Sequence, residues 1–175
     1  IDVQRINGKV VLAPMLRDRL VLTQTGILEF GEPDILYVND GKGRFKPVSW
    51  TGGAFRNESG NQLARTPVDW GLSATFRDIN GDGAPDLYVC NDFWTPDRIW
   101  INDGTGRFQA ISRFAIRHTS ENSMGVDFTD IDRDGYLDFI VVDMLSRDSA
   151  LRKRQASAQT RMPASQNDIA SRPQF

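Results

Sequence analysis

The sequence predicts an all-β fold, because two kinds of β-hairpin motif alternate along the chain. The first kind is an acidic, glycine-containing loop followed by a short apolar strand, and it occurs at 76–92 and again at 128–143. The second kind is a strand that begins near a Pro-Asp pair and ends in an Asn-Asp-Gly-x-Gly turn, and it occurs at 33–45 and 96–108. The apolar runs are rich in β-branched and aromatic residues, which favour strands, and the glycines permit the positive φ of hairpin turns.

Each acidic loop carries oxygen-bearing side chains at alternate positions, so that they can converge on one centre. The first loop contributes Asp78, Asn80, Asp82 and Asp86, and the second contributes Asp130, Asp132, Asp134 and Asp138. A glycine after the third position allows the sharp turn, and the carbonyls of Ala84 and Tyr136 are expected as main-chain ligands. Because all these donors are hard oxygens, with no His or Cys among them, the sequence predicts two Ca²⁺ sites.

Two other interpretations of the acidic loops compete with this one. An EF-hand begins with a similar loop but needs a bidentate Glu at position twelve. That position is Val89 in the first loop and Val141 in the second, and the flanking segments have the composition of strands rather than helices. The other alternative is a pair of acidic surface turns, since Asp, Asn and Gly favour turns without any metal. The match between the two copies favours the metal.

The order of the hairpins predicts a β-propeller segment of four-stranded antiparallel blades, with calcium loops in the inner hairpins. An acidic hairpin and the Asn-Asp-Gly hairpin after it give four strands, expected near 72–78, 86–91, 98–102 and 107–112. Such a unit, repeated along a chain, is typical of propeller blades. The predicted parts of one propeller spanning 1–175 are an outer hairpin of a first blade (30–50), an inter-blade loop (51–70), a complete blade with a calcium loop (71–112), the calcium hairpin of the next blade (123–145) and a polar connection or insertion (146–175).

This number of blades does not close a propeller, which typically has four to eight. The chain, which begins at Ile1, is therefore expected to be processed or a fragment of a longer protein. Further blades are expected from the same longer chain or from other chains. The strand before each acidic loop is expected at the innermost position of its blade, since Leu72, Ala74 and Phe76 alternate with polar residues.

Charge and composition argue against several classes of function. The formal net charge is −2, and because basic residues gather after position 146 the rest of the chain is acidic, which argues against a nucleic-acid partner. No apolar run approaches membrane-spanning length, so no membrane insertion is expected. The single histidine, His118, belongs to no nucleophile or zinc motif, and no catalytic residue is predicted. The lone Cys90 is expected to be a buried strand residue.

Four tryptophans are candidates for a sugar-binding platform, although aromatic residues at strand and loop ends more often serve packing. They are Trp50, Trp70, Trp94 and Trp100. Trp94, in the loop between two predicted strands, is the best ligand-contact candidate of the four. The sequence does not identify the ligand.

The segments DINGDGAPDLYV and DIDRDGYLDFIV, which alternate with ILYVNDGKGRF and IWINDGTGRF, resemble FG-GAP/VCBS-type repeats. Such repeats build the propeller of integrin alpha subunits, and the likeness is closer to bacterial secreted proteins of the cartilage-acidic-protein-like group. The resemblance covers roughly residues 30–145. Asn80 departs from the pattern, because an Asp is usual at the third loop position, and the first site therefore has one carboxylate fewer.

The resemblance implies a non-enzymatic, calcium-binding propeller repeat module that is secreted or displayed at the cell surface and contacts protein or glycan. Calcium loops agree with that location, because weak structural calcium sites are usually filled only outside the cell. One alternative is a structural subunit of a surface assembly or fibre. Another is a non-catalytic part of a polysaccharide-degrading enzyme.

Overall fold

The computed structural model describes residues 3–7, 9–12, 19–22, 27–93, 95–112, 114–116, 118–120, 122–144 and 146–158. Its elements are almost all strands, which confirms the mostly-β class predicted from the sequence. In chain order they are β1 (Val3–Ile6), β2 (Lys9–Leu12), β3 (Leu20–Leu22), β4 (Ile27–Glu29), β5 (Tyr37–Asn39), β6 (Phe45–Pro47), β7 (Phe55–Arg56), β8 (Gly71–Arg77), β9 (Asp86–Asn91), β10 (Arg98–Asn102), β11 (Phe108–Ala110), β12 (Ser123–Thr129), β13 (Asp138–Asp143) and α1 (Ser149–Ala158). Among these residues, no helix combines the length and apolar character needed to cross a membrane.

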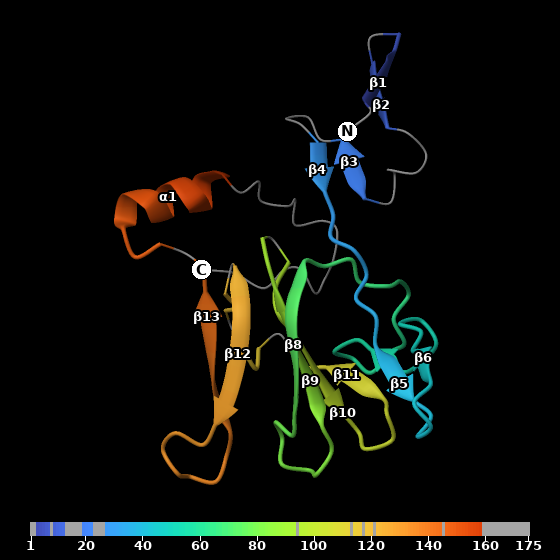
Figure 1. Ribbon diagram of the computed structural model, residues 1–175, viewed down its shortest axis with the longest axis vertical. Coiled ribbons are helices and arrows are strands. Elements are labelled where there is room, and N and C mark those ends of the chain that lie inside the picture. Colours follow the sequence, from blue (N-terminus) through green and yellow to red (C-terminus); the bar gives the residue numbers. More distant parts are fainter. Residues whose placement is uncertain are drawn as a thin grey trace.

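The largest sheet has the strand order β7-β11-β10-β9-β8 (Figure 1). Strands β8 to β11 pair with their chain neighbours in antiparallel fashion, close to the positions predicted from the sequence. Every position of β9 is buried, because apolar groups cover both faces of this strand. At the far edge, β7 joins β11 in parallel and places Phe55 beside Phe108.

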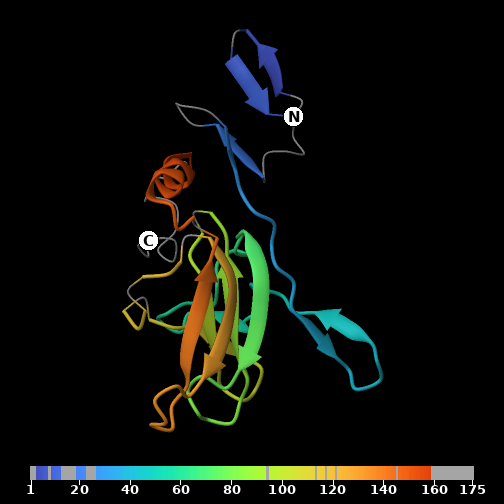
Figure 2. The same cartoon turned by 60° about the vertical axis from the view of Figure 1, so that its left-hand side comes forward.

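Strands β12 and β13 form a separate antiparallel hairpin that packs against β8 and β9 (Figure 2). Phe128 of β12 is buried, and its ring centroid lies 5.9 Å from that of Tyr88 and 5.6 Å from that of Phe139. Ile99 and Cys90 belong to the same apolar cluster. Burial of aliphatic and aromatic side chains contributes roughly 1.5–3 kcal/mol each, and this cluster therefore holds the hairpin to the sheet.

A second core lies on the opposite face of β9. Successive side chains of a strand point to opposite faces, so that Tyr88 and Cys90 enter the first cluster while Leu87 and Val89 enter the second. The segment before β5 contributes to the second core through Leu36, which packs against it. Strand β9 is therefore enclosed between two hydrophobic cores.

Phe55 is the centre of the second core. It is fully buried, and its ring centroid lies 3.9 Å from Trp50, 5.2 Å from Trp100 and 5.3 Å from Phe108. The segment 51–70, predicted only as a polar loop, thus supplies both a strand and a core residue. The prediction missed this because glycine and polar residues surround the apolar anchor in the sequence.

The remaining hairpins lie at the periphery. Hairpin β5–β6 coincides with the Asn-Asp-Gly hairpin predicted from the sequence, and Oδ1 of Asn39 accepts hydrogen bonds from the N–H groups of Gly41 and Gly43. Pairs β1–β2 and β3–β4 are further antiparallel hairpins. Helix α1 begins after Asp148, whose Oδ1 accepts the N–H groups of residues 150 and 151, and residues 159–175 of the predicted polar tail lie outside the described part.

Candidate metal centre

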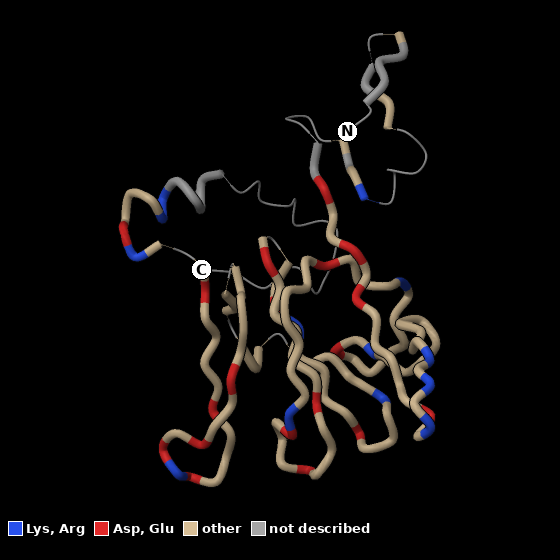
Figure 3. The backbone as a smooth tube through the Cα atoms, viewed as in Figure 1, with Lys and Arg blue, Asp and Glu red and all other residues tan. Residues whose placement is uncertain are grey.

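Both acidic loops connect the two strands of a hairpin, and both lie at the same end of the molecule (Figure 3). The first joins β8 to β9 and the second joins β12 to β13. In the first loop Gly81 and Gly83 have φ values of 76° and 88°. At the matching places in the second loop, Arg133 and Gly135 have φ values of 65° and 92°. The two loops therefore share a backbone conformation, although an arginine costs more than a glycine at a positive φ.

In the second loop the carboxylates of Asp130, Asp132 and Asp138 come together. Each offers an oxygen, and these oxygens all lie within 4.8 Å of one another. Side chains of Asp132 and Asp138 are exposed, and that of Asp130 is half-buried. Three carboxylates at this spacing can bind one cation through hard oxygen ligands, which is the donor set that Ca²⁺ prefers.

Backbone N–H groups of the second loop hold these carboxylates in place. Oδ1 of Asp130 accepts the N–H of Asp134 at 3.1 Å, and its Oδ2 accepts the N–H of Gly135 at 3.0 Å. Oδ2 of Asp138 accepts the N–H of Ile131 at 3.0 Å. The loop is therefore wrapped around its acidic side chains, and hydrogen bonds to the charged form offset part of their mutual repulsion.

Asp134, also predicted as a ligand, is placed differently from these three carboxylates. The carboxylate of Asp134 lies outside the group of three, and its Oδ1 accepts the N–H of Tyr136 at 2.8 Å. Tyr136 is 75% exposed, and its predicted ligand atom is the main-chain carbonyl, so its ring is not part of the predicted site. The structure thus brings together three of the four predicted carboxylates of this loop.

In the first loop, backbone N–H groups also hold an acidic side chain in place. The Asp78 carboxylate accepts N–H groups of Gly81, Asp82 and Gly83 at 2.8, 3.1 and 2.9 Å. Nδ2 of Asn80 donates to Oδ2 of Asp82 at 2.8 Å. Within the described residues, only the second loop gathers three acidic side chains at metal-ligand spacing.

Asp86 and Asp138 occupy the same place in the two loops but differ in surroundings. Asp86 is fully buried, and its two oxygens accept N–H groups of Ile79 and Asn102, each at 2.8 Å. It therefore ties the first loop to the end of β10. Asp138 is exposed and receives one such bond. Ala84, the predicted carbonyl donor of the first loop, is buried at the same end of the sheet.

The other candidate residues of the sequence serve packing or lie elsewhere. Trp50 and Trp100 are core residues, and Trp70 makes an edge-on contact with the ring of Phe93. His118 is exposed. Trp94 lies outside the described residues.

Cys90 is fully buried in β9, as expected from the strand pattern. Burial raises the pKa of its thiol, so that the side chain stays neutral. A neutral, buried thiol behaves as a small apolar side chain and is a weak nucleophile.

Sequence reasoning missed a buried polar cluster at the end of the sheet opposite the acidic loops. Oδ2 of Asp97 accepts hydroxyl hydrogen bonds from Tyr88 and Ser123, each at 2.8 Å, and its Oδ1 accepts the N–H of Asn91 at 2.8 Å. Burial raises the pKa of Asp97, while these hydrogen bonds oppose the rise. The sequence feature that could have indicated this cluster is the Pro-Asp pair, which both Asn-Asp-Gly hairpins share.

A buried ion pair lies at the same end. Arg98 donates through Nη2 to Oδ1 of Asp69 at 2.8 Å and through Nε to the other oxygen. Both side chains are buried. Their charges also act on Asp34, whose pKa is raised by burial and by Asp69 and lowered by Arg98.

Comparison with known proteins identifies the repeats. A family model described as FG-GAP-like repeat matches residues 27–89 and 78–141, which together cover more than half of the chain. No significant match was found among curated proteins or among solved structures. The chain belongs to the FG-GAP-like repeat family.

Proposed function

We propose that this chain is a calcium-binding, non-enzymatic segment of a β-propeller that makes contacts with protein or glycan outside the cell. The observation that carries the proposal is the group of carboxylate oxygens of Asp130, Asp132 and Asp138, all within 4.8 Å of one another. The carbonyl of Tyr136 and the carboxylate of Asp134 are the further ligands that the repeat pattern supplies. Calcium takes six to eight oxygen ligands at about 2.3–2.6 Å in flexible geometry, which suits such a loop.

The first loop is proposed as a second, weaker calcium site. Its ligand series of Asp78, Asn80, Asp82 and Asp86 has one charge fewer than the second loop, and ligand charge raises affinity. Both oxygens of Asp86 already accept backbone N–H groups. These bonds compete with a cation for the electron density of the same carboxylate.

The packing of β9 supports the propeller arrangement. Tyr88 and Cys90 of β9 are 1% and 0% exposed because hairpin β12–β13 covers them. The residues at the same places in β13, Ile140 and Val142, are 61% and 52% exposed. We infer that another hairpin of the same kind covers them, from the same longer chain or from another chain. Completion between chains would make the protein a subunit of a surface assembly.

Calorimetric titration with Ca²⁺ tests the metal proposal through a matched pair of variants. Asp130→Ala and Asp78→Ala remove the first ligand of the second and first loops, and Asp103→Ala in a turn outside both loops is the control. The proposal predicts that Asp130→Ala removes the tighter binding event and that Asp78→Ala removes the weaker one. The absence of calcium binding in the unaltered chain would contradict it.

A further inference from the structure

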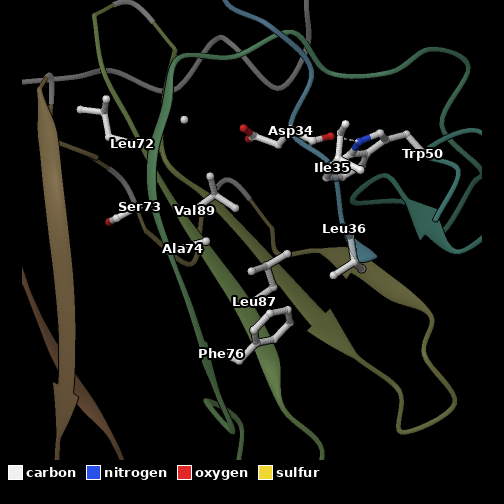
Figure 4. A pocket seen from close by; sticks show the side chains of 11 residues that line it. Asp34, Ile35, Leu36, Trp50, Leu72, Ser73, Ala74, Phe76, Leu87 and Val89 are labelled. Atoms are coloured by element: carbon white, nitrogen blue, oxygen red, sulfur yellow. Dashed lines mark hydrogen bonds between the residues drawn. The ribbon is translucent and has the colours of Figure 1, made fainter. Parts of the chain in front are cut away.

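An exposed Asn-Gly pair, Asn80-Gly81, lies in the first acidic loop. The β8–β9 hairpin holds this loop at both ends, and Phe76 of β8 pairs with Leu87 of β9 at the base of the loop (Figure 4). In the second acidic loop, the matching pair is Asp-Arg. The first loop therefore carries an amide at the place where the second loop carries a carboxylate.

An asparagine that precedes a glycine can lose its amide without an enzyme. The backbone nitrogen of the following residue attacks Cγ of the asparagine side chain, and the amide nitrogen leaves. A side chain on the following residue hinders this attack, and glycine has none. The sequence of the pair therefore makes Asn80 reactive, and the folded loop decides which groups assist the reaction.

The hydrogen bonds of the folded loop place an assisting group at each reacting atom. The attacking nitrogen is that of Gly81, whose N–H donates to Oδ1 of Asp78 at 2.8 Å, a distance suited to a general base. The N–H of Asp82 donates to Oδ1 of Asn80 at 3.1 Å, where negative charge develops during the attack. The leaving nitrogen, Nδ2 of Asn80, donates to Oδ2 of Asp82 at 2.8 Å.

We propose that Asn80 is a self-deamidation site, at which the loop converts an amide to a carboxylate with water as the co-reactant. The Gly81 nitrogen gives its proton to Asp78 and bonds to Cγ of Asn80, which closes a cyclic imide. The Cγ–Nδ2 bond breaks, and the nitrogen leaves as ammonia after it takes up that proton. Water then adds to Cγ and breaks its bond to the Gly81 nitrogen, which restores the peptide N–H and leaves an aspartate at position 80.

The second loop shows what this product does to the ligand set. Position 80 corresponds to Asp132, whose carboxylate lies with those of Asp130 and Asp138 in the group of oxygens within 4.8 Å of one another. The first loop already has aspartates at the other two matching places, Asp78 and Asp86. Deamidation therefore gives the first loop the same carboxylates as the second. This consequence rests on the proposed calcium function, whereas the deamidation itself does not.

Peptide mass spectrometry of the full chain, incubated in metal-free buffer, tests the modification. We expect Asn80 to gain the mass of a single deamidation about tenfold faster than Asn61, which is also exposed but precedes a glutamine. Gly81→Arg should slow the conversion severalfold, and the loop should tolerate it because Arg133 adopts a φ of 65° at the matching place. Equal rates at Asn80 and Asn61 would overturn the inference.

Two further comparisons test the part played by the folded loop. Asp78→Asn keeps the shape of the side chain but removes the base, so it should slow the conversion of Asn80. Asp127→Asn, at an exposed aspartate outside both loops, should leave the rate unchanged. Asn7, in the other Asn-Gly pair of the chain, reports the reactivity of the pair alone and should convert more slowly than Asn80. An unchanged rate in Asp78→Asn would overturn the inference.

Calorimetric titration of Asn80→Asp with Ca²⁺ tests the consequence for the metal site. We expect the affinity of the first loop to rise about tenfold, because ligand charge raises affinity. Cleavage of the incubated chain before position 80 by an aspartate-specific endoprotease should show that the normal peptide linkage forms. An unchanged affinity in Asn80→Asp, or a product with only a β-linked backbone, would overturn the claim that deamidation completes the ligand set. An absence of calcium binding in both loops would contradict the proposed function, while the mass change at Asn80 would still establish the deamidation.

Discussion

The hydroxyl of Ser123 at the start of β12 donates a 2.8 Å hydrogen bond to Oδ2 of Asp97, which directly precedes β10. This bond joins the β12–β13 hairpin to the central sheet at the end opposite the acidic loops. Tyr88 and Asn91 of β9 donate to the same carboxylate. One buried side chain therefore connects three strands from two successive repeats.

Loss of the Ser123 hydroxyl should weaken the attachment of the hairpin. Ser123→Ala is expected to lower the free energy of unfolding by about 1 kcal/mol, the typical net value of one hydrogen bond. Urea denaturation measures the change, and Ser59→Ala on the exposed surface is the control. An equal effect of both substitutions would show that the bond contributes nothing.

Replacement of Asp97 itself should lower the free energy of unfolding more than the loss of the Ser123 hydroxyl does. Asp97→Ala leaves three buried donors without an acceptor, and each such donor costs about 1–3 kcal/mol. The expected loss in urea denaturation is therefore several times that of Ser123→Ala. If Asp97→Ala lowers the free energy of unfolding no more than Ser123→Ala, water must replace the carboxylate as the hydrogen-bond acceptor.

The titration of Asp97 should differ from that of an exposed aspartate. Burial is the largest cause that raises its pKa above 3.8, so the folded state binds this proton more tightly than the unfolded state. Its contribution to stability is then complete below 3.8 and is lost as the pH rises through the folded pKa. Carboxyl ¹³C titration checks this, with Asp103 as the contrast, because hydrogen bonds from Thr105 lower its pKa. A pKa of Asp97 at or below that of Asp103 would contradict the assignment.

Truncation of Phe55 should show that β7 belongs to the core. Phe55→Ala is expected to cost about 3–5 kcal/mol, the range for a buried aromatic residue. Ile140→Ala, at a position 61% exposed, is expected to cost far less. Thermal or urea unfolding of both variants gives the comparison, and similar losses would place Phe55 outside the core.

Exposed apolar residues of β13 should promote association. Paired substitutions Ile140→Ser and Val142→Ser are expected to reduce self-association at high concentration and to leave unfolding almost unchanged, since neither side chain is buried. Light scattering measures the first effect and urea denaturation the second. Unchanged particle size would argue against this face as a contact surface.

The alternating pattern of the sequence was sufficient to predict strands β8 to β13, because period-two apolar residues and Asn-Asp-Gly turns are local signals. Strand β7 was missed, since its place in the sheet depends on contacts of Phe55 with residues far away in the sequence. The partners of Asp97 were missed for the same reason: Ser123 and Tyr88 reach it only after the repeats pack together.

The acidic loops could be located from their residue spacing, and the structure adds a difference between them. Matched sequences led to the prediction of two similar sites, with Asn80 as the main difference. The surroundings of Asp86 and Asp138 now separate the loops further, because Asn102 of the following strand bonds to Asp86 alone. The difference depends on the strand that lies next to each loop, which cannot be inferred from the spacing of residues within the loop.

Thermal unfolding in millimolar Ca²⁺ and in excess chelator tests the central claim most directly. A site with a dissociation constant of about 10⁻⁴–10⁻³ M stabilises the folded state by roughly 1 kcal/mol at millimolar calcium. For a chain of this size, that corresponds to about 2–4 °C in melting temperature. The account predicts a shift of this size that Asp130→Ala abolishes and Asp103→Ala preserves. Identical melting curves in calcium and in chelator would show that the loops are acidic turns without a metal.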